Sequence, residues 1–441
     1  MPDLHCHASQ VESAPRRPHQ RPHRCSAGGL ALALGAVLTG LSGCASGPAS
    51  LADDRLAYNE VVKVTAEQQM LLNIVRLRYT DTPSSLAISS IATQTERTRS
   101  LQLVPFFGVV GGEAQLRGGQ ALLPGAAIST VDRPTITLTP LDDTEFTRKL
   151  FTPMTLDGVL YLAKTTWPIS TVFRLWLENL NWVSNAETAS GPTSADVPEF
   201  GRFVEGVEAL QALQDKGMIV FGTREREDVV GGPIAAARVA ARDVVDAARE
   251  GLEYRPDPGG ATWSLVRRRP QPVVRVHPNA AGTPEMKALA EAFRIRLGPR
   301  SYDIGFESLD PFPATYPAAG VDVFDLETRS LLQVLYFLSK GVEVPPTHQA
   351  QGVARTTRHP DGKPFDWTQV TRGLFRVRQS AAEQPPANAH VAIRYLGHWF
   401  SIERGDHDSL STFSLVLELA RLELSGKAAP GPALTLPLTG R

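Results

Sequence analysis

The fold class is decided by two apolar segments that follow each other closely, Ala261-Thr262-Trp263-Ser264-Leu265-Val266-Arg267-Arg268 and Pro272-Val273-Val274-Arg275-Val276-His277. The first contains Thr262, Trp263 and Val266 and the second contains three valines, and β-branched and aromatic residues favour strands, so each segment predicts a strand. No stretch long enough for a helix separates them, which is unlike the regular strand–helix alternation of a doubly wound sheet. Helical patterns flank the pair near 234–250 and 283–297. This mixture of elements predicts an α+β fold.

Residues 52–183 are predicted to form an N-terminal α+β domain. A long helix is expected over 52–79, because apolar residues recur there at three- and four-residue steps. The segment 84–139 is rich in Ser, Thr, Ile, Val and Gly and predicts a long glycine-rich hairpin with an apolar tip. Three further helices, separated by prolines, are expected over 142–152, 155–166 and 169–182.

The polar segment 184–198 predicts a linker, because its small and polar residues show no periodicity. A C-terminal α+β domain is expected to follow over 199–426. Its expected elements are a helix over 199–216, a strand over 218–223, an apolar helix over 325–341, a hairpin about Gly397 and a last helix that opens after Asp408 as N-cap. Residues 427–441 are predicted to be a disordered tail.

Residues 1–43 predict an export signal. Four arginines precede an uncharged run from Ala27 to Gly43, which is the layout of a secretory leader. The run is too short and too rich in Gly and Ser for a spanning helix, which needs about 20 apolar residues. Residues 44–51 then predict a short flexible tether, whose reach at full extension is about 25 Å.

The end of this leader, Leu41-Ser42-Gly43-Cys44, resembles the lipobox of bacterial lipoproteins. The resemblance implies that the thiol of Cys44 receives a diacylglycerol, that the chain is cleaved before it, and that the new amino terminus is acylated. In that family an Asp after the cysteine favours the inner membrane, whereas this chain has Ala45. The resemblance therefore implies an outer-membrane protein that faces the periplasm and is attached to the membrane through Cys44. The anchor and the short tether then favour envelope proteins as partners. Several acyl chains anchor stably, whereas one is marginal.

Three further stretches are similar to a set of uncharacterised bacterial lipoproteins. They are Leu71-Leu72-Asn73-Ile74-Val75-Arg76-Leu77-Arg78-Tyr79, Arg133-Pro134-Thr135-Ile136 and Trp399-Phe400-Ser401-Ile402. This resemblance spans most of the chain and brings no assigned activity with it.

Composition narrows the function classes. Without the four arginines and two acids of residues 1–43, the 45 basic and 46 acidic residues leave a net charge of about −3, which gives no reason to expect nucleic acid. Cys44 is the only one of three cysteines left after cleavage, so the mature chain can form no internal disulfide, and lipidation excludes a cysteine nucleophile. No cofactor is expected.

The usual catalytic signatures are absent. The sequence has no G-x-S-x-G, H-E-x-x-H, G-x-x-x-x-G-K-[ST] or G-x-G-x-x-G pattern. The densest polar cluster is His398 with Asp406, His407 and Asp408, in which two imidazoles and two carboxylates could hold a metal or act in hydrolysis. Alternatively, Asp406 is there to form a turn and Asp408 to cap the following helix, and no metal is needed to account for these residue types.

A basic run, Arg267-Arg268-Arg269 with Arg275 nearby, could contact phosphate groups of lipid or lipopolysaccharide. The alternative is a solvated strand end whose arginines oppose edge-to-edge pairing.

Three functions remain open on the sequence alone. The first is a non-enzymatic outer-membrane lipoprotein with a periplasmic binding or envelope-assembly role. The second is an oligomeric export or pore component in which several protomers contribute the hairpin 84–139 to a sheet without unpaired edges, as a membrane demands. The third is an envelope hydrolase with a site near His398.

Overall fold

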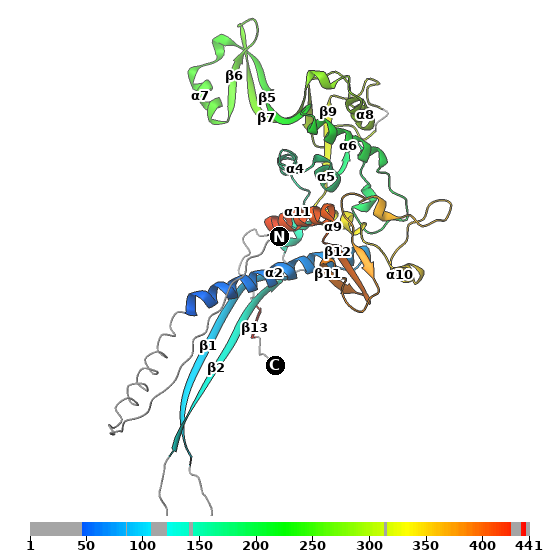
Figure 1. The fold of residues 1–441 in the computed structure, drawn as a ribbon. Helices are drawn as coiled ribbons and strands as arrows, with labels where there is room; N and C mark the ends of the chain where they lie inside the picture. Colours follow the sequence, from blue (N-terminus) through cyan, green and yellow to red (C-terminus); the bar gives the residue numbers. More distant parts are fainter. Residues whose placement is uncertain are drawn as a thin grey trace, which may run out of the picture. The chain divides into compact units, whose positions relative to one another are not determined.

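The computed structural model describes residues 46–84, 86–106, 121–140, 144–312, 315–424 and 434–437 (Figure 1). Contacts divide the chain into two compact units, Met1–Val62 and Lys63–Arg441, and the division falls inside the first described helix. Helices and strands are both abundant and do not alternate regularly. The predicted α+β class is therefore confirmed.

Helix α2 (Ser46–Arg78) confirms the helix predicted over 52–79. It begins earlier than predicted, so residues 46–51, which were expected to belong to a flexible tether, are its first turns. Pro48 is compatible with this start, because the first N–H groups of a helix have no acceptor within it. The apolar side chains of the last two turns are buried, namely Leu71, Ile74, Val75 and Leu77.

Strands β1 (Leu86–Phe106) and β2 (Ala121–Pro140) form a long antiparallel ribbon and confirm the hairpin predicted over 84–139. Their register runs from Leu86 opposite Pro140 to Phe106 opposite Ala121, with one irregularity near Ser90. The predicted apolar tip, 107–120, lies outside the described residues.

A short strand from the C-terminal segment joins this ribbon. Strand β13 (Leu434–Pro437) pairs antiparallel with β2 over Thr135–Leu138. The prediction of a disordered tail over 427–441 is therefore wrong for these residues. The edge of β2 presents unpaired N–H and C=O groups, and any extended segment can form hydrogen bonds with them. Such a segment needs no helical or core-forming pattern, so its sequence gives no sign that it will pair.

The body of the second unit contains a seven-stranded sheet in the order β4-β3-β9-β8-β7-β5, with β6 also pairing β7. The strands are β3 (Leu177–Leu180), β4 (Val183–Ser184), β5 (Ile219–Ala235), β6 (Leu252–Pro256), β7 (Thr262–Val276), β8 (Ser301–Gly305) and β9 (Val323–Thr328). Only β8 and β9 run parallel. The two strands predicted over 261–277 are one continuous strand, β7, because the arginines between them go on pairing with β5.

Two predicted helices are in part strands of this sheet. The helix expected over 169–182 ends at Trp176 and continues as β3. The helix expected over 325–341 begins only at Leu331, because Ser330 accepts a hydrogen bond from the Gln333 amide and caps it. Apolar runs do not distinguish a buried strand from a buried helix, and here the pairing of β3 with β9 decides.

The remaining helices of the body pack into one core. They are α3 (Thr144–Phe151), α4 (Leu156–Ala163), α5 (Ile169–Trp176), α6 (Gly201–Asp215), α8 (Pro284–Phe293) and α9 (Leu331–Ser339). Helices α6 and α8 pack closely at Gly206, where a Cβ would lie 2.5 Å from Phe293 Cζ. Within the described residues, no helix has the length and apolar character needed to cross a bilayer.

The segment 184–198 is not an exposed linker. Its buried residues include Asn185, Ala189 and Thr193, which are at most 1% exposed. Asn185 donates to the carbonyl oxygens of Arg174 and Leu177 at 2.8 and 2.7 Å. The sheet and the core both continue across this segment, so the predicted division into domains 52–183 and 199–426 does not describe the packing. Small polar residues can line a core when their polar groups are hydrogen-bonded, and composition does not reveal that.

A second, three-stranded sheet lies near the C-terminus. It has the order β10-β12-β11, with β10 (Arg378–Ser380), β11 (Ala389–Tyr395) and β12 (His398–Glu403), and the hairpin predicted about Gly397 is confirmed. Helix α10 (Pro346–Ala350) precedes it. The last helix, α11 (His407–Leu424), begins earlier than predicted.

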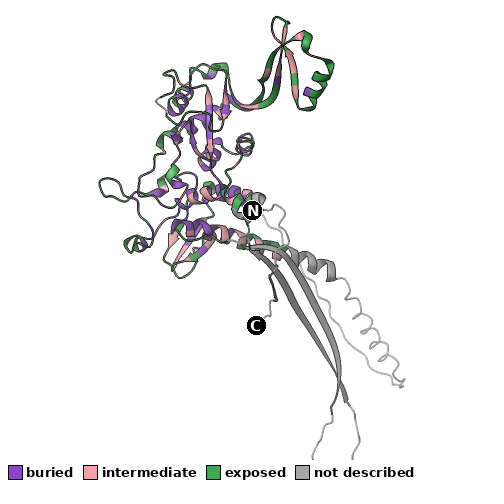
Figure 2. Cartoon of the chain, turned by 180° about the vertical axis from the view of Figure 1, so that it is seen from behind, coloured by how far each residue is buried: buried purple, intermediate pink, exposed green. Residues whose placement is uncertain are grey.

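The ends of β5 and β7 extend from the sheet and carry β6 and α7 (Ala241–Arg249), and most residues of this arm are exposed (Figure 2). The helix predicted over 234–250 is shorter, because residues 234 and 235 still belong to β5 and Ala236–Arg238 form a separate 3-10 turn.

Candidate functional site

The residues predicted from the sequence as site candidates do not form a metal centre. Cys44 lies outside the described residues. Asp406 is occupied at the start of α11, where its two carboxylate oxygens accept from the Ser409 amide and hydroxyl at 3.1 and 2.7 Å. Asp406 and not Asp408 therefore caps the helix, and His407 and Asp408 are its first two residues. Among the described residues, no group of three or more His, Cys, Asp or Glu is placed to hold a metal ion.

His398 instead belongs to a cluster of rings. Its imidazole lies edge-on to that of His348, with ring centroids 4.6 Å apart. The Nδ1 atom of His348 is 2.9 Å from the hydroxyl of Tyr79. Burial and then the neighbouring His398 lower the pKa of His348, and burial raises the pKa of Tyr79 above its ordinary value. Neither imidazole forms an ion pair within the described part of the chain.

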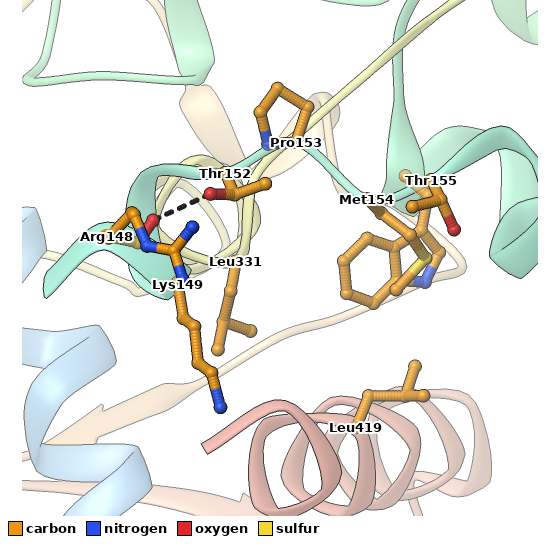
Figure 3. A pocket seen from close by; sticks show the side chains of 9 residues that line it. Arg148, Lys149, Thr152, Pro153, Met154, Thr155, Leu331 and Leu419 are labelled. Atoms are coloured by element: carbon orange, nitrogen blue, oxygen red, sulfur yellow. Dashed lines mark hydrogen bonds between the residues drawn. The ribbon is translucent and has the colours of Figure 1, made fainter. Parts of the chain in front are cut away.

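A small pocket lies between α3, α9 and α11. Figure 3 shows its basic mouth, Arg148 and Lys149, and its apolar side chains Leu331 and Leu419. Its volume is about 190 Å³, and Trp176 contributes a buried indole N–H that has no acceptor. This space suits a short apolar group, and its described lining residues include no carboxylate or imidazole.

A much larger hollow, about 910 Å³, lies where β5 and β7 leave the sheet, but its charges are compensated internally. Its arginines pair with acids: Arg226 and Arg269 with Asp228, and Arg296 with Asp322.

The predicted basic run belongs to the same strand, β7. Strand β7 pairs with β5 along the whole run, and on its other side it pairs with β6 up to Arg267 and with β8 from Val273. The run is therefore not at a strand end, and of its arginines only Arg268 and Arg269 lie where one side of β7 has no partner strand among the described residues. Arg268 pairs with Glu227 and Glu253, and Arg275 donates to the carbonyl of Thr223. These partners leave less positive charge available to phosphate groups than the sequence suggested.

Three buried cations surround the segment 184–198. The first, Arg329, is fully buried and hydrogen-bonded in every direction. Its guanidinium donates to the Ser190 hydroxyl and to the carbonyl oxygens of Arg174, Leu175 and Asn185. It also lies 4.2 Å from the ring centroid of Phe337. Arg329 therefore joins α5, the segment 185–190 and α9, and because each of its three guanidinium nitrogens has an acceptor we regard it as a structural residue.

The other two cations, Arg78 and Lys340, share one cavity. Arg78 ends α2 and Lys340 caps the C-terminus of α9, so two elements distant in sequence place them together. The Arg78 Nη1 atom donates to the hydroxyl of Thr193 at 2.9 Å, and the Lys340 Nζ atom is 3.4 Å from the same hydroxyl. Lys340 also donates to the carbonyl of Gly191 at 2.9 Å and lies 5.2 Å from the ring centroid of Trp367.

This cavity, called the Arg78–Lys340 cavity below, has a volume of about 390 Å³. Beyond the two cations, its lining includes two acids, a third cation and several apolar or aromatic residues: Glu343, Asp366, Arg376, Val342, Val344, Pro346, Pro364, Phe365 and Trp367. Glu343 is already paired with Arg376, and Asp366 accepts from the amide and hydroxyl of Thr368.

The two buried cations of this cavity have no negatively charged partner among the described residues. Arg78 is 6% exposed and Lys340 is completely buried, and neither forms an ion pair within the described part of the chain. The Nε atom of Arg78 is buried without an acceptor. Burial, and then the charge of Arg78, lower the pKa of Lys340 to about 7, and burial lowers the pKa of Arg78 to about 10. Buried charges in proteins are normally paired, so this pair of cations needs an explanation.

The sequence carries a weak signal for these two residues. Arg78 follows the apolar run 71–77, and Lys340 ends the apolar run of α9, so helical spacing puts both near the core. The usual interpretation of a lysine there is that it complements the helix dipole. That both side chains turn toward one cavity depends on tertiary packing.

We compared the chain with known proteins, and no protein-family model, curated protein or solved structure matches it.

Proposed function

We propose that this chain is a non-enzymatic lipoprotein of the outer membrane that faces the periplasm and assembles with other envelope proteins through the β1–β2 ribbon. The lipobox-like sequence Leu41-Ser42-Gly43-Cys44 supports the anchor. The lack of hydrolase signatures in the sequence supports a role in binding. The ribbon carries the proposal for assembly.

Most of the two outer edges of the ribbon have no partner strand among the described residues. Each strand is about twenty residues long, which corresponds to roughly 65 Å at about 3.3 Å per residue. Within the described ranges, β13 covers β2 only over Thr135–Leu138, and β1 has no neighbour other than β2. Two-stranded ribbons are marginally stable in water, and open edges of this length pair readily with another chain. A strand offered by an envelope protein would satisfy these backbone groups.

The anchor and the ribbon are tested separately. Mass spectrometry of the purified mature protein should show an acylated N-terminal Cys44, and a Cys44→Ser variant should appear in the soluble periplasmic fraction. An unmodified mature N-terminus at another residue would refute the anchor.

For the ribbon, a photo-crosslinking amino acid is placed at Ser100 in β1 and, as a control, at Tyr161 in α4, which is 71% exposed. Crosslinks to envelope proteins are expected from position 100 and not from position 161, and they should disappear when residues 104–125 are deleted. Recovery of only free monomer from detergent-solubilised envelope, without crosslinks at position 100, would refute assembly through the ribbon.

The same open edges support a second candidate function, an oligomeric export or pore component. Here the partner strand comes from another copy of this chain, with β1 of one copy paired to β2 of the next, and repeated pairing can close into a ring. Deletion of residues 104–125 should then abolish both the oligomer and the associated membrane permeability. An oligomer that survives the deletion would exclude this function.

A further inference from the structure

Two buried, unpaired cations that line one cavity suggest a missing anion. Arg78 and Lys340 both approach the single hydroxyl of Thr193, which can compensate neither charge. Their other acceptors are neutral main-chain carbonyl oxygens, those of Arg355 at 3.4 Å and Gly191 at 2.9 Å.

The contrast with Arg329 shows that burial alone does not explain this arrangement. The Nε and both Nη atoms of Arg329 have acceptors, and no cavity described above is lined by it. Arg78 has an orphaned Nε and lines a cavity of about 390 Å³. A cation needed only to hold the fold would gain from saturated donors, as Arg329 does.

The acids around the cavity do not replace the missing anion. Glu343 forms its ion pairs with Arg376 and Arg378, and Asp366 accepts hydrogen bonds from Thr368. These two carboxylates, with Arg78, Arg376 and Lys340 itself, are the charged groups that line the cavity.

We propose that the Arg78–Lys340 cavity binds a small phosphate monoester. A carboxylate would leave one of two buried positive charges uncompensated, whereas a phosphate monoester carries about −1.5 to −2 charges at pH 7. Its oxygens match the planar fork of Arg78 and the point charge of Lys340. The volume is in the range of small-molecule sites, and Val342, Val344 and Pro364 provide an apolar wall for the organic part of the ligand.

Binding should be coupled to proton uptake. Lys340 is partly neutral near pH 7 in the free protein, and a dianion next to it favours the protonated form. The complex therefore takes up protons at pH 7 to 9, and its affinity falls as the pH rises through this range.

The test is isothermal titration calorimetry on the full mature chain in neutral detergent and phosphate-free buffer. The probes are glycerol 3-phosphate as a soluble monoester, short-chain phosphatidic acid as a lipid monoester, and glycerol as the uncharged control. Titrations in two buffers of different ionisation enthalpy measure the protons taken up. If both monoesters bind, the site exists and a soluble phosphate monoester is enough to occupy it. If only phosphatidic acid binds, the site exists and its ligand is a lipid.

The variants Lys340→Met and Arg78→Lys should each weaken binding by about 10- to 100-fold, because each loses charge-assisted hydrogen bonds. Arg78→Lys keeps the positive charge and removes only the planar guanidinium group. It therefore tests the site even if the Lys340→Met variant does not fold. The control is Lys363→Met, at an exposed lysine paired with Asp361. The proposal is overturned if neither monoester binds at millimolar concentration, or if the two cavity variants bind as tightly as the control.

Discussion

Lys340 should make the stability of this protein depend on pH in a direction that is unusual for a lysine. Its pKa is lowered from 10.5 to about 7 in the folded chain, by burial first and by Arg78 second. Between these two values the unfolded chain binds more protons than the folded chain. The free energy of unfolding therefore rises with pH across this window, and the gain is lost as the pH falls toward 7.

The expected size follows from the two pKa values. Linkage with values of 10.5 and about 7 gives a rise of about 2 kcal/mol in the free energy of unfolding between pH 7 and pH 9. The pKa values of Tyr79, Tyr302, Tyr316 and Tyr395 are all raised above the ordinary value for tyrosine, so these groups titrate above this window in the folded chain. Replacing Lys340 by Met removes the titrating group and roughly keeps its volume. Because Lys340 has no ion-pair partner among the described residues, its replacement also removes the cost of burying an uncompensated charge.

The assay is urea unfolding of wild type and Lys340→Met at pH 7, 8 and 9, without added anions. The variant should be at least as stable as wild type at pH 7, and the difference between them should shrink by about 2 kcal/mol by pH 9. Parallel pH profiles would show that Lys340 does not titrate in this window. A variant several kcal/mol less stable at pH 7 would show that the ammonium is well compensated in the free protein, contrary to the electrostatics of the cavity.

Three further substitutions test the packing. Arg329→Met should destabilise the protein by about 3–5 kcal/mol in urea unfolding, since it leaves buried carbonyl oxygens without donors, and a stable variant would contradict the structural role of Arg329. Gly206→Ala should lower the free energy of unfolding by about 1–3 kcal/mol, because the new Cβ overlaps the ring of Phe293 in α8. Gly201→Ala, in the same helix, has no atom within 4 Å of the new Cβ and should not destabilise the protein. Equal Tm values for the two variants would contradict the close packing of α6 and α8. Asp406→Ala should lower the free energy of unfolding by about 1 kcal/mol and Asp408→Ala by less, because Asp406 accepts the capping hydrogen bonds. A larger loss for Asp408→Ala would indicate that Asp408 is the cap.

Local patterns predicted the elements whose signals lie within a few residues. The end of α2, the β11–β12 hairpin about Gly397 and the α+β class follow from periodicity and turn residues alone. The β1–β2 ribbon was also predictable, because glycine content and β-branched residues disfavour a helix there.

Errors arose where two structures were compatible with one local pattern. Leu177–Leu180 continues an apolar helical spacing, yet it is a strand because β9 offers hydrogen-bonding partners from residues 326–328. The segment 184–198 has the composition of a linker, yet its hydroxyl and carbonyl oxygens accept hydrogen bonds from Arg329, Lys340 and Arg78. In both cases the deciding partner lies more than a hundred residues away.

The sequence by itself determined the lipobox resemblance at Cys44, the fold class and the long ribbon, since each depends on residue types within a short stretch. Only the tertiary structure decided that Arg78 and Lys340 meet at Thr193. The physical reason is the energy of a buried charge, which depends on burial and on every partner that packing brings near, and no property of the lysine or the arginine alone contains it.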